Sequence, residues 1–162
     1  MKKILLLFVC LFVCWALFAQ QRIKVACVGN SITYGTGLAD RATQSYPVQL
    51  QKLLGEHYEV ENFGKPGATL LNQGHRPYTR QEEYRKALDF AGDIVVIHLG
   101  INDTDPRDWP NYRDSFVTDY LNLMDTFRKA NPDVRIIIAR MTPIADRHNR
   151  FLSGTRDWHG EM

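Results

Sequence analysis

The sequence predicts an α/β fold in which helices cover both faces of a parallel sheet, a doubly wound three-layer sandwich. Short runs of apolar, β-branched residues alternate along the chain with segments whose apolar residues recur at helical spacing. The runs lack an alternation of polar and apolar residues, which is typical of strands buried on both faces of a parallel sheet. The chain has 162 residues, 44% hydrophobic and 23% charged, and these values suit one globular domain.

The first half of the chain predicts a strand, a helix and a second strand. Residues Ile23–Val28 form a short apolar run rich in β-branched side chains, as in a buried strand. The segment Tyr46–Leu54 carries apolar residues at helical spacing, and Tyr58–Asn62 has the pattern of a short strand. Together they predict one strand–helix–strand unit.

The second half predicts two helices, each followed by a strand. Residues Thr79–Phe90 form a charged helix, and Ile94–Leu99 form the most apolar strand. Residues Arg113–Lys129 predict a long helix that ends at Asn131-Pro132, and Arg135–Ala139 predict a fourth strand. The residues expected on the inner side of the long helix are Phe116, Tyr120, Leu121, Leu123, Met124 and Phe127. No fifth strand is predicted.

The start of the chain has the pattern of a secretory signal peptide. Lys2-Lys3 give a basic start, residues 4–18 are almost all apolar, and the small residue Ala19 precedes a polar segment. An apolar run of about 15 residues is shorter than the roughly 20 that a membrane-spanning helix needs, which argues against the alternative of a permanent anchor. We expect residues 1–19 to be cleaved, residues 22–162 to form the domain, and the protein to be exported to the periplasm or beyond the cell.

Composition argues against several classes of function. The expected cleavage leaves Cys27 as the one cysteine, so an internal disulfide is not expected. It also removes the net charge of +2, and a neutral domain has no electrostatic reason to bind nucleic acid. The histidines lack zinc-site spacing, and Asp103, Asp105 and Asp108 lack the glycine and glutamate of a calcium loop. We therefore expect a solvated acidic loop, with no metal and no cofactor.

In a doubly wound sheet, ligands bind beyond the carboxyl ends of the strands, where four loops of this chain lie. The first, Gly29–Thr33, places Ser31 directly after a buried strand and at the start of a helix. This serine is a candidate nucleophile whose backbone N–H faces a developing oxyanion, and a serine that caps the helix is the alternative. The glycines here fit neither G-x-G-x-x-G nor a phosphate loop, so nucleotide binding is not expected.

The loops after the second and third strands supply hydrogen-bond donors. Gly64 and Gly67 in the second loop allow the backbone to approach a ligand closely, although an ordinary turn is the alternative. In the third loop, Asn102 places a side-chain amide at the same edge of the sheet. A hydroxyl nucleophile beside N–H donors that face the carbonyl oxygen is what acyl transfer needs.

In order and spacing, these three loops resemble the sequence blocks of the SGNH (GDSL-type) hydrolase superfamily. The first block corresponds to Gly29–Thr33, the second, N-x-G-x-x-G, to Asn62–Gly67, and the third, G-x-N-D, to Gly100–Asp103. The resemblance implies a flavodoxin-like sandwich and the hydrolysis of esters. The site residues that it implies are Ser31 as nucleophile and Gly67 and Asn102 as oxyanion donors.

The chain departs from the family pattern at two points. Asn30 stands where the family usually has Asp, a residue outside the catalytic triad, and we expect the change to be tolerated. The family's base comes from a late D-x-x-H block after a fifth strand, whereas Asp146 and His148, like Asp157 and His159, are spaced differently. We therefore expect an N-terminal fragment of a longer protein, which lacks the catalytic His and Asp and has little esterase activity alone.

The expected export and the stretch Arg150–His159 are similar to those of carbohydrate O-acetylesterases, including the SGNH domains of sialate O-acetylesterase-like bacterial proteins. This similarity implies a serine acyl-enzyme that removes acetyl groups from a glycan or another small ester. Four residues flank the second and third loops, where they either line a sugar pocket or pack as ordinary surface residues: His75, Arg76, Trp109 and Tyr112. The alternatives are a non-catalytic carbohydrate-binding module on the same fold and an acyl-thioesterase.

Overall fold

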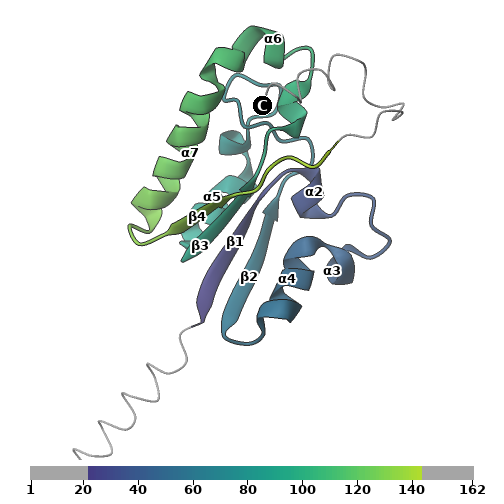
Figure 1. The fold of residues 1–162 in the computed structure, drawn as a ribbon, viewed down its shortest axis with the longest axis vertical. Helices are drawn as coiled ribbons and strands as arrows, with labels where there is room; N and C mark the ends of the chain where they lie inside the picture. Colours follow the sequence, from purple (N-terminus) through teal and green to yellow (C-terminus); the bar gives the residue numbers. More distant parts are fainter. Residues whose placement is uncertain (1–21, 144–162) are drawn as a thin grey trace, which may run out of the picture.

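The computed structural model describes residues 22–143, which form one four-stranded sheet with helices on both faces (Figure 1). The strands are β1 (Ile23–Gly29), β2 (Tyr58–Gly64), β3 (Ile94–His98) and β4 (Arg135–Ile138). The helices are α2 (Ser31–Tyr34), α3 (Arg41–Gln44), α4 (Tyr46–Leu54), α5 (Glu82–Phe90), α6 (Trp109–Tyr112) and α7 (Phe116–Ala130), with 3₁₀ turns at Tyr78–Arg80, Ile101–Thr104 and Arg113–Ser115. The predicted signal peptide, and His148 and His159, lie outside the described residues.

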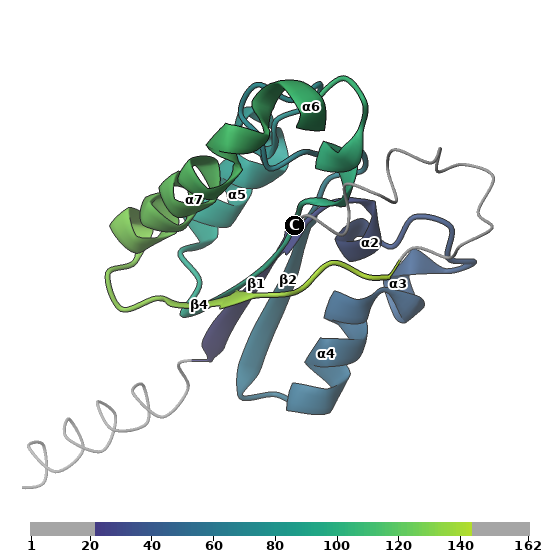
Figure 2. The ribbon, with the colours of Figure 1, turned by 45° about the horizontal axis from the view of Figure 1, so that its top comes forward.

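All three strand pairs are parallel, and the strand order is β2-β1-β3-β4. The chain runs outward from β1 to β2, crosses back to β3 and then runs outward to β4, so the order reverses between β1 and β3. Figure 2 shows α2, α3 and α4 on one face of the sheet and α5 and α7 on the other. The predicted doubly wound fold is confirmed, and in such folds ligands bind beyond the strand ends at the reversal.

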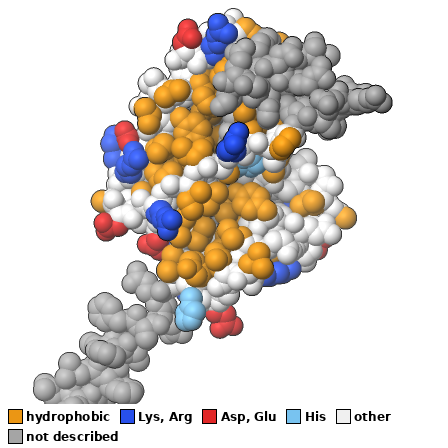
Figure 3. Space-filling view, in the orientation of Figure 1, with side chains coloured by type: hydrophobic (Ala, Val, Ile, Leu, Met, Phe, Trp, Pro, Cys, Tyr) orange, Lys and Arg blue, Asp and Glu red, His pale blue; other side chains and the backbone are white. Residues whose placement is uncertain are grey.

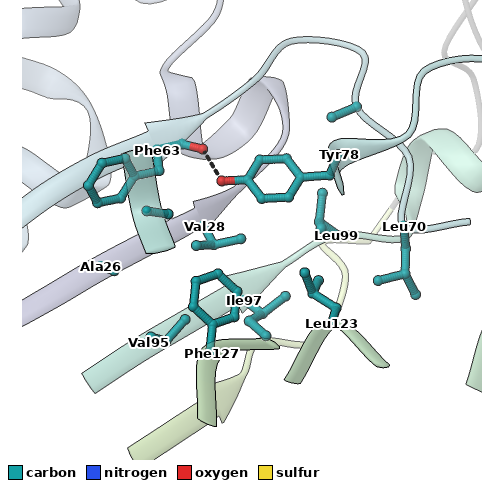
Figure 4. Packing of buried hydrophobic residues seen from close by; sticks show 12 residues of the cluster. Ala26, Val28, Phe63, Leu70, Tyr78, Val95, Ile97, Leu99, Leu123 and Phe127 are labelled. Carbon is teal, nitrogen blue, oxygen red and sulfur yellow. Dashed lines mark hydrogen bonds between the residues drawn. The ribbon is translucent and has the colours of Figure 1, made fainter. Parts of the chain in front are cut away.

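The hydrophobic core lies between the sheet and the layer of α5 and α7. Ile97 of β3 is fully buried, and Leu123 and Phe127 of α7 pack in the same cluster (Figure 4). The Tyr78 hydroxyl reaches across this cluster and donates to the Phe63 carbonyl oxygen at 2.8 Å. The core therefore ties the loop that follows β2 to the sheet itself.

The packing differs from the sequence-based expectation at two places. Leu121 is 52% exposed rather than inward, because it lies two residues before Leu123 and thus about 160° around the helix from it, outside the buried stripe that contains Leu123 and Phe127. Ile137 and Ile138 of β4 are 43% and 51% exposed rather than buried on both faces. Among the described strands, β4 pairs only with β3 and so lies at one edge of the sheet. Hydrophobic side chains also gather on the face of the molecule that Figure 3 shows.

Helix boundaries also differ in detail. The predicted helix that begins at Thr79 is interrupted at Gln81, whose backbone is extended, and regular helix begins at Glu82. The predicted helix from Arg113 begins with one 3₁₀ turn, and α7 itself begins at Phe116. Both differences leave the helical faces that pack on the sheet unchanged.

Candidate active site

The carboxyl ends of three strands meet at one level of the sheet. Gly29, the last residue of β1, is in register with Gly64 of β2 and with His98 of β3. The Gly29 carbonyl oxygen also accepts a hydrogen bond from the Lys65 N–H at 2.9 Å. The three loops singled out by the sequence therefore start side by side at the reversal of strand order.

Ser31 is the first residue of α2, and its side chain is half-buried at the start of this one-turn helix. The fully buried Asn30 caps the helix, since its Oδ1 accepts a hydrogen bond from the Ile32 N–H at 3.0 Å. The helix ends at Gly35, which has a φ of +91° and donates to the Ser31 carbonyl oxygen. The alternative that Ser31 serves as the cap is thus wrong, and its hydroxyl is free of that task.

Two contacts fix α2 against the end of β2. Asn62 donates from Nδ2 to the Thr33 carbonyl oxygen at 2.8 Å and accepts from the Gly64 N–H at 2.9 Å. A Cβ atom on Gly64 would lie 2.3 Å from the Tyr34 backbone nitrogen, so the close approach requires glycine. Asn62 and Gly64 therefore position the helix that carries Ser31.

Residues Lys65–Ala68 form a tight turn at the start of the second loop. The Ala68 N–H donates to the Lys65 carbonyl oxygen at 3.1 Å, and Gly67 has a φ of +78°. Together with Pro66 at the second position, these are the features of a type II turn. No acceptor for the Gly67 N–H is present within residues 22–143, so this donor is available at the edge of the sheet. The sequence left open whether this loop is an ordinary turn or part of a ligand site. It is a turn, and the turn presents the Gly67 N–H, the candidate donor.

Asn102 joins the third loop to this turn. Its side-chain Nδ2 donates to the Ala68 carbonyl oxygen at 2.8 Å, and the loop begins at Gly100 with a φ of +123°. An amide nitrogen carries two hydrogens, so one N–H of Asn102 remains for a ligand. The candidate donors Gly67 and Asn102 therefore belong to one hydrogen-bonded unit.

Asp103 holds the chain that follows the turn. Its two carboxylate oxygens accept from the Leu71 N–H at 2.7 Å and from the Leu70 N–H at 2.9 Å. Burial raises the pKa of Asp103 to about 7, although these backbone donors oppose the rise. Asp103 and Asp108 are both buried, so the expectation of a solvated acidic loop is wrong. Both oxygens of Asp103 accept from backbone N–H groups, and Asp108 accepts from the backbone N–H of His75 through Oδ1.

A histidine–carboxylate pair lies in the same region. His75 Nδ1 is 2.6 Å from Asp108 Oδ2, and the His75 backbone N–H donates to Asp108 Oδ1 at 2.9 Å. Potential ligand atoms of His75, Asp105 and Asp108 lie within 4.8 Å of one another. Arg107 forms a two-point contact with Asp105 and holds the pKa of that carboxyl at about 2. Arg107 therefore pairs with Asp105, and His75 pairs with Asp108. His75 and Asp108 are 33 residues apart, and the sequence did not reveal this pair.

The remaining side chains that flank the loops have different surroundings. Trp109 is buried and packs edge-on against Phe116, so it fits the packing alternative rather than a sugar pocket. Arg76 is exposed and donates from Nη1 to the Pro66 carbonyl oxygen at 3.0 Å.

A cavity of about 190 Å³ lies beyond the ends of β3 and β4. Its lining residues are Leu99, Phe116, Tyr120, Ile138, Ala139, Arg140 and Met141.

The two other described histidines are placed differently. His57 lies at the opposite edge of the sheet, where its carbonyl oxygen accepts from the N–H of Ile23 at the start of β1. His98 is buried at the end of β3, and burial lowers its pKa.

Comparison with known proteins identifies related sequences. Residues 27–162 match the GDSL-like Lipase/Acylhydrolase family. An acetylxylan esterase from Xylanibacter ruminicola is 44% identical over 109 residues, which is 67% of this chain and 22% of that enzyme. The chain therefore spans about a fifth of the length of this relative.

Solved structures share the fold at lower identity. A carbohydrate acetylesterase family member from Sinorhizobium meliloti superposes with a TM-score of 0.65 and 21% identity, over 85% of this chain and 73% of that one. A family two carbohydrate esterase from Clostridium thermocellum, solved with cellohexaose, has a TM-score of 0.59 and 22% identity, over 87% and 47%. An aryl esterase from M. smegmatis has a TM-score of 0.57 and 18% identity, over 85% and 74%.

Proposed function

The chain belongs to the GDSL-like lipase/acylhydrolase family, and we propose that it carries the nucleophile and the oxyanion hole of a serine ester hydrolase. One observation carries the proposal: the Asn102 amide is bonded to the turn that presents the Gly67 N–H, at the strand ends where Ser31 begins α2. This arrangement offers a hydroxyl and two N–H donors at one edge of the sheet.

In the proposed reaction, the Ser31 hydroxyl oxygen attacks the ester carbonyl carbon and forms a tetrahedral intermediate. The Gly67 N–H and the free N–H of Asn102 donate to its oxyanion, which collapses to an acyl-serine as the alcohol leaves. A histidine base takes the serine proton in such mechanisms and returns it to the leaving alcohol, and water then releases the acid from the acyl-serine.

We propose an acetylated glycan as the substrate. The relative that is 44% identical is an acetylxylan esterase, which favours acetyl groups on xylan or a similar polysaccharide over long acyl chains. The leader-like residues 1–19 support export to the place where such polymers are found. None of the helices within the described range is long and apolar enough to cross a membrane.

Acetate release from acetylated xylan by the full-length natural protein tests the proposal. We expect Ser31→Ala to lower turnover by about 10⁴-fold or more while binding of the polysaccharide is retained. Ser115→Ala is the matched control, because Ser115 is the N-cap residue before α7 and makes no side-chain capping bond. Unchanged turnover in Ser31→Ala would refute Ser31 as the nucleophile. Binding of the polysaccharide without turnover in the unaltered protein would favour a carbohydrate-binding module. Preference for acetyl-CoA over acetylated xylan would favour a thioesterase.

A further inference from the structure

The Arg76 guanidinium lies against the turn that presents the Gly67 N–H. Its Nη1 donates to the Pro66 carbonyl oxygen at 3.0 Å. A Cβ atom placed on Gly67 would lie 3.2 Å from Nη1 and 3.6 Å from Cδ of Arg76, so the side chain passes directly over the turn. The Pro66 carbonyl group that accepts this bond belongs to the same peptide group as the Gly67 N–H.

The Pro66–Gly67 peptide group is planar and trans, so its C=O and N–H point in opposite directions. Any donor that fixes the Pro66 oxygen therefore also fixes the direction of the Gly67 N–H. The turn alone does not fix it, since type I and type II turns differ by a flip of this central peptide and glycine at the third position tolerates both. The hydrogen bond from Arg76 is made in the observed, type II orientation.

We propose that Arg76 is a positioning residue, which aims and polarises the Gly67 N–H as an oxyanion donor through the peptide group that they share. The inference rests on the proposed function of Gly67. A charged donor on a carbonyl oxygen gives a stronger hydrogen bond than a neutral one and strengthens donation by the N–H of the same amide. Arg76 therefore acts on the developing oxyanion without touching it.

The surroundings of Arg76 fit this role. Its backbone is anchored, because the Arg76 carbonyl oxygen accepts from the Thr69 N–H at 2.9 Å and Tyr78 donates to the Thr69 carbonyl oxygen at 2.9 Å. Within residues 22–143 no carboxylate forms an ion pair with Arg76, so none of these residues neutralises its charge. The guanidinium thus brings its positive charge to the turn that presents the Gly67 N–H.

Arg76→Gln in the full-length natural protein tests the inference, with acetate release and binding of methylboronic acid as readouts. The boronic acid forms a tetrahedral adduct with a serine hydroxyl and mimics the intermediate. Removing an oxyanion donor outright costs about 10²- to 10³-fold, and we expect misaiming it to lower kcat by roughly 10- to 100-fold with KM nearly unchanged. Boronate affinity falls by a similar factor, and Arg76→Lys, which keeps the charge and a donor, recovers most of both.

Arg80→Gln is the matched control. Arg80 is also exposed and also donates to a loop carbonyl oxygen, that of Asn72 at 3.3 Å, but it is not bonded to the turn. We expect less than about a twofold change in either readout. Equal effects of the two substitutions, or an effect of Arg76→Gln on KM alone, overturn the inference.

The Gly67 amide gives a second readout that does not depend on turnover. We expect Arg76→Gln, but not Arg80→Gln, to shift the ¹⁵N resonance of Gly67, and an unshifted resonance contradicts the inference. If Ser31→Ala abolishes turnover and Arg76→Gln leaves it intact, only this inference fails. If Ser31→Ala retains turnover, the proposed function fails with it.

Discussion

Asn102 donates from its side-chain Nδ2 to the carbonyl oxygen of Ala68 at 2.8 Å, and this contact joins the loops that follow β2 and β3. It fixes the rotation of the carboxamide, since the nitrogen must face Ala68. The second hydrogen of the same nitrogen is thereby directed without any further partner. The same side chain thus connects the two loops and provides a donor.

Replacing Asn102 is expected to reduce catalysis more than stability. Asn102→Ala removes one of the two proposed oxyanion donors, and we expect kcat to fall by about 10²- to 10³-fold with little change in KM. Loss of the bond to Ala68 costs about 1 kcal/mol of unfolding free energy. Steady-state kinetics and denaturant midpoints measure the two effects, and the exposed Asn122→Ala is the control. A fall in midpoint with unchanged kcat would show that Asn102 only supports the loops.

Gly64→Ala is expected to displace Ser31 without touching it. The new Cβ would meet the Tyr34 backbone nitrogen at 2.3 Å, and backbone atoms must move to relieve this contact. We expect a loss of about 1–3 kcal/mol in stability, as for other overpacked sites, and a clear fall in kcat. Gly55→Ala is the matched control, because Gly55 has a φ of +76° but open space around it. Its φ and ψ of +76° and −165° are essentially restricted to glycine, so Gly55→Ala is expected to lose about 1–3 kcal/mol while kcat is unchanged.

Removal of the His75 ring is expected to destabilise the loop around Asp108. Asp108 is buried, and His75→Ala leaves Oδ2 without its partner at 2.6 Å. Such an unmatched group costs about 1–3 kcal/mol, measurable as a lower denaturant midpoint. His75→Asn keeps a nitrogen donor near the position of Nδ1 and is expected to recover part of the loss. Equal midpoints for His75→Ala and the unaltered protein would show that the His75 ring does not stabilise the buried Asp108.

The loops of the candidate site could be located from the sequence because their signals are local. Glycine lies at or just after the end of each of the first three strands and shows where the ligand edge lies, and Ser31 and Asn102 follow those glycines within two residues. The Pro66-Gly67 pair is itself a type II turn signal, which indicates the direction of the loop after β2. These features depend on neighbours in the chain, which the sequence displays.

The contacts that organise the loops were not predictable, because they join distant residues. Asp103 accepts from Leu70 and Leu71 more than 30 residues earlier, and Asp108 is paired with His75 over the same separation. Without the fold, a series of aspartates between two helices has the pattern of a solvated loop. Burial, which only the fold reveals, turns those carboxylates into partners for backbone N–H groups.

The buried Asp103 gives a specific pH dependence of stability. Its pKa is about 7 in the folded chain and 3.8 as an ordinary value, so the folded state binds the extra proton between these limits. The resulting stabilisation is complete below about pH 4 and is lost as the pH rises through 7, and at 1.36 kcal/mol per unit it amounts to at most about 4 kcal/mol. The free energy of unfolding from urea titrations between pH 4.5 and 8 measures this loss.

Asp103→Asn is expected to flatten that dependence, because a carboxamide does not titrate. His98, whose pKa is lowered by burial, contributes a slope of the opposite sign in both proteins, so the difference between the two curves isolates Asp103. Asp133→Asn is the control, since Asp133 is exposed, and it is expected to keep the slope of the unaltered protein. If Asp103→Asn keeps that slope as well, the carboxyl is already ionised at pH 4.5, and its two bonds to Leu70 and Leu71 outweigh its burial.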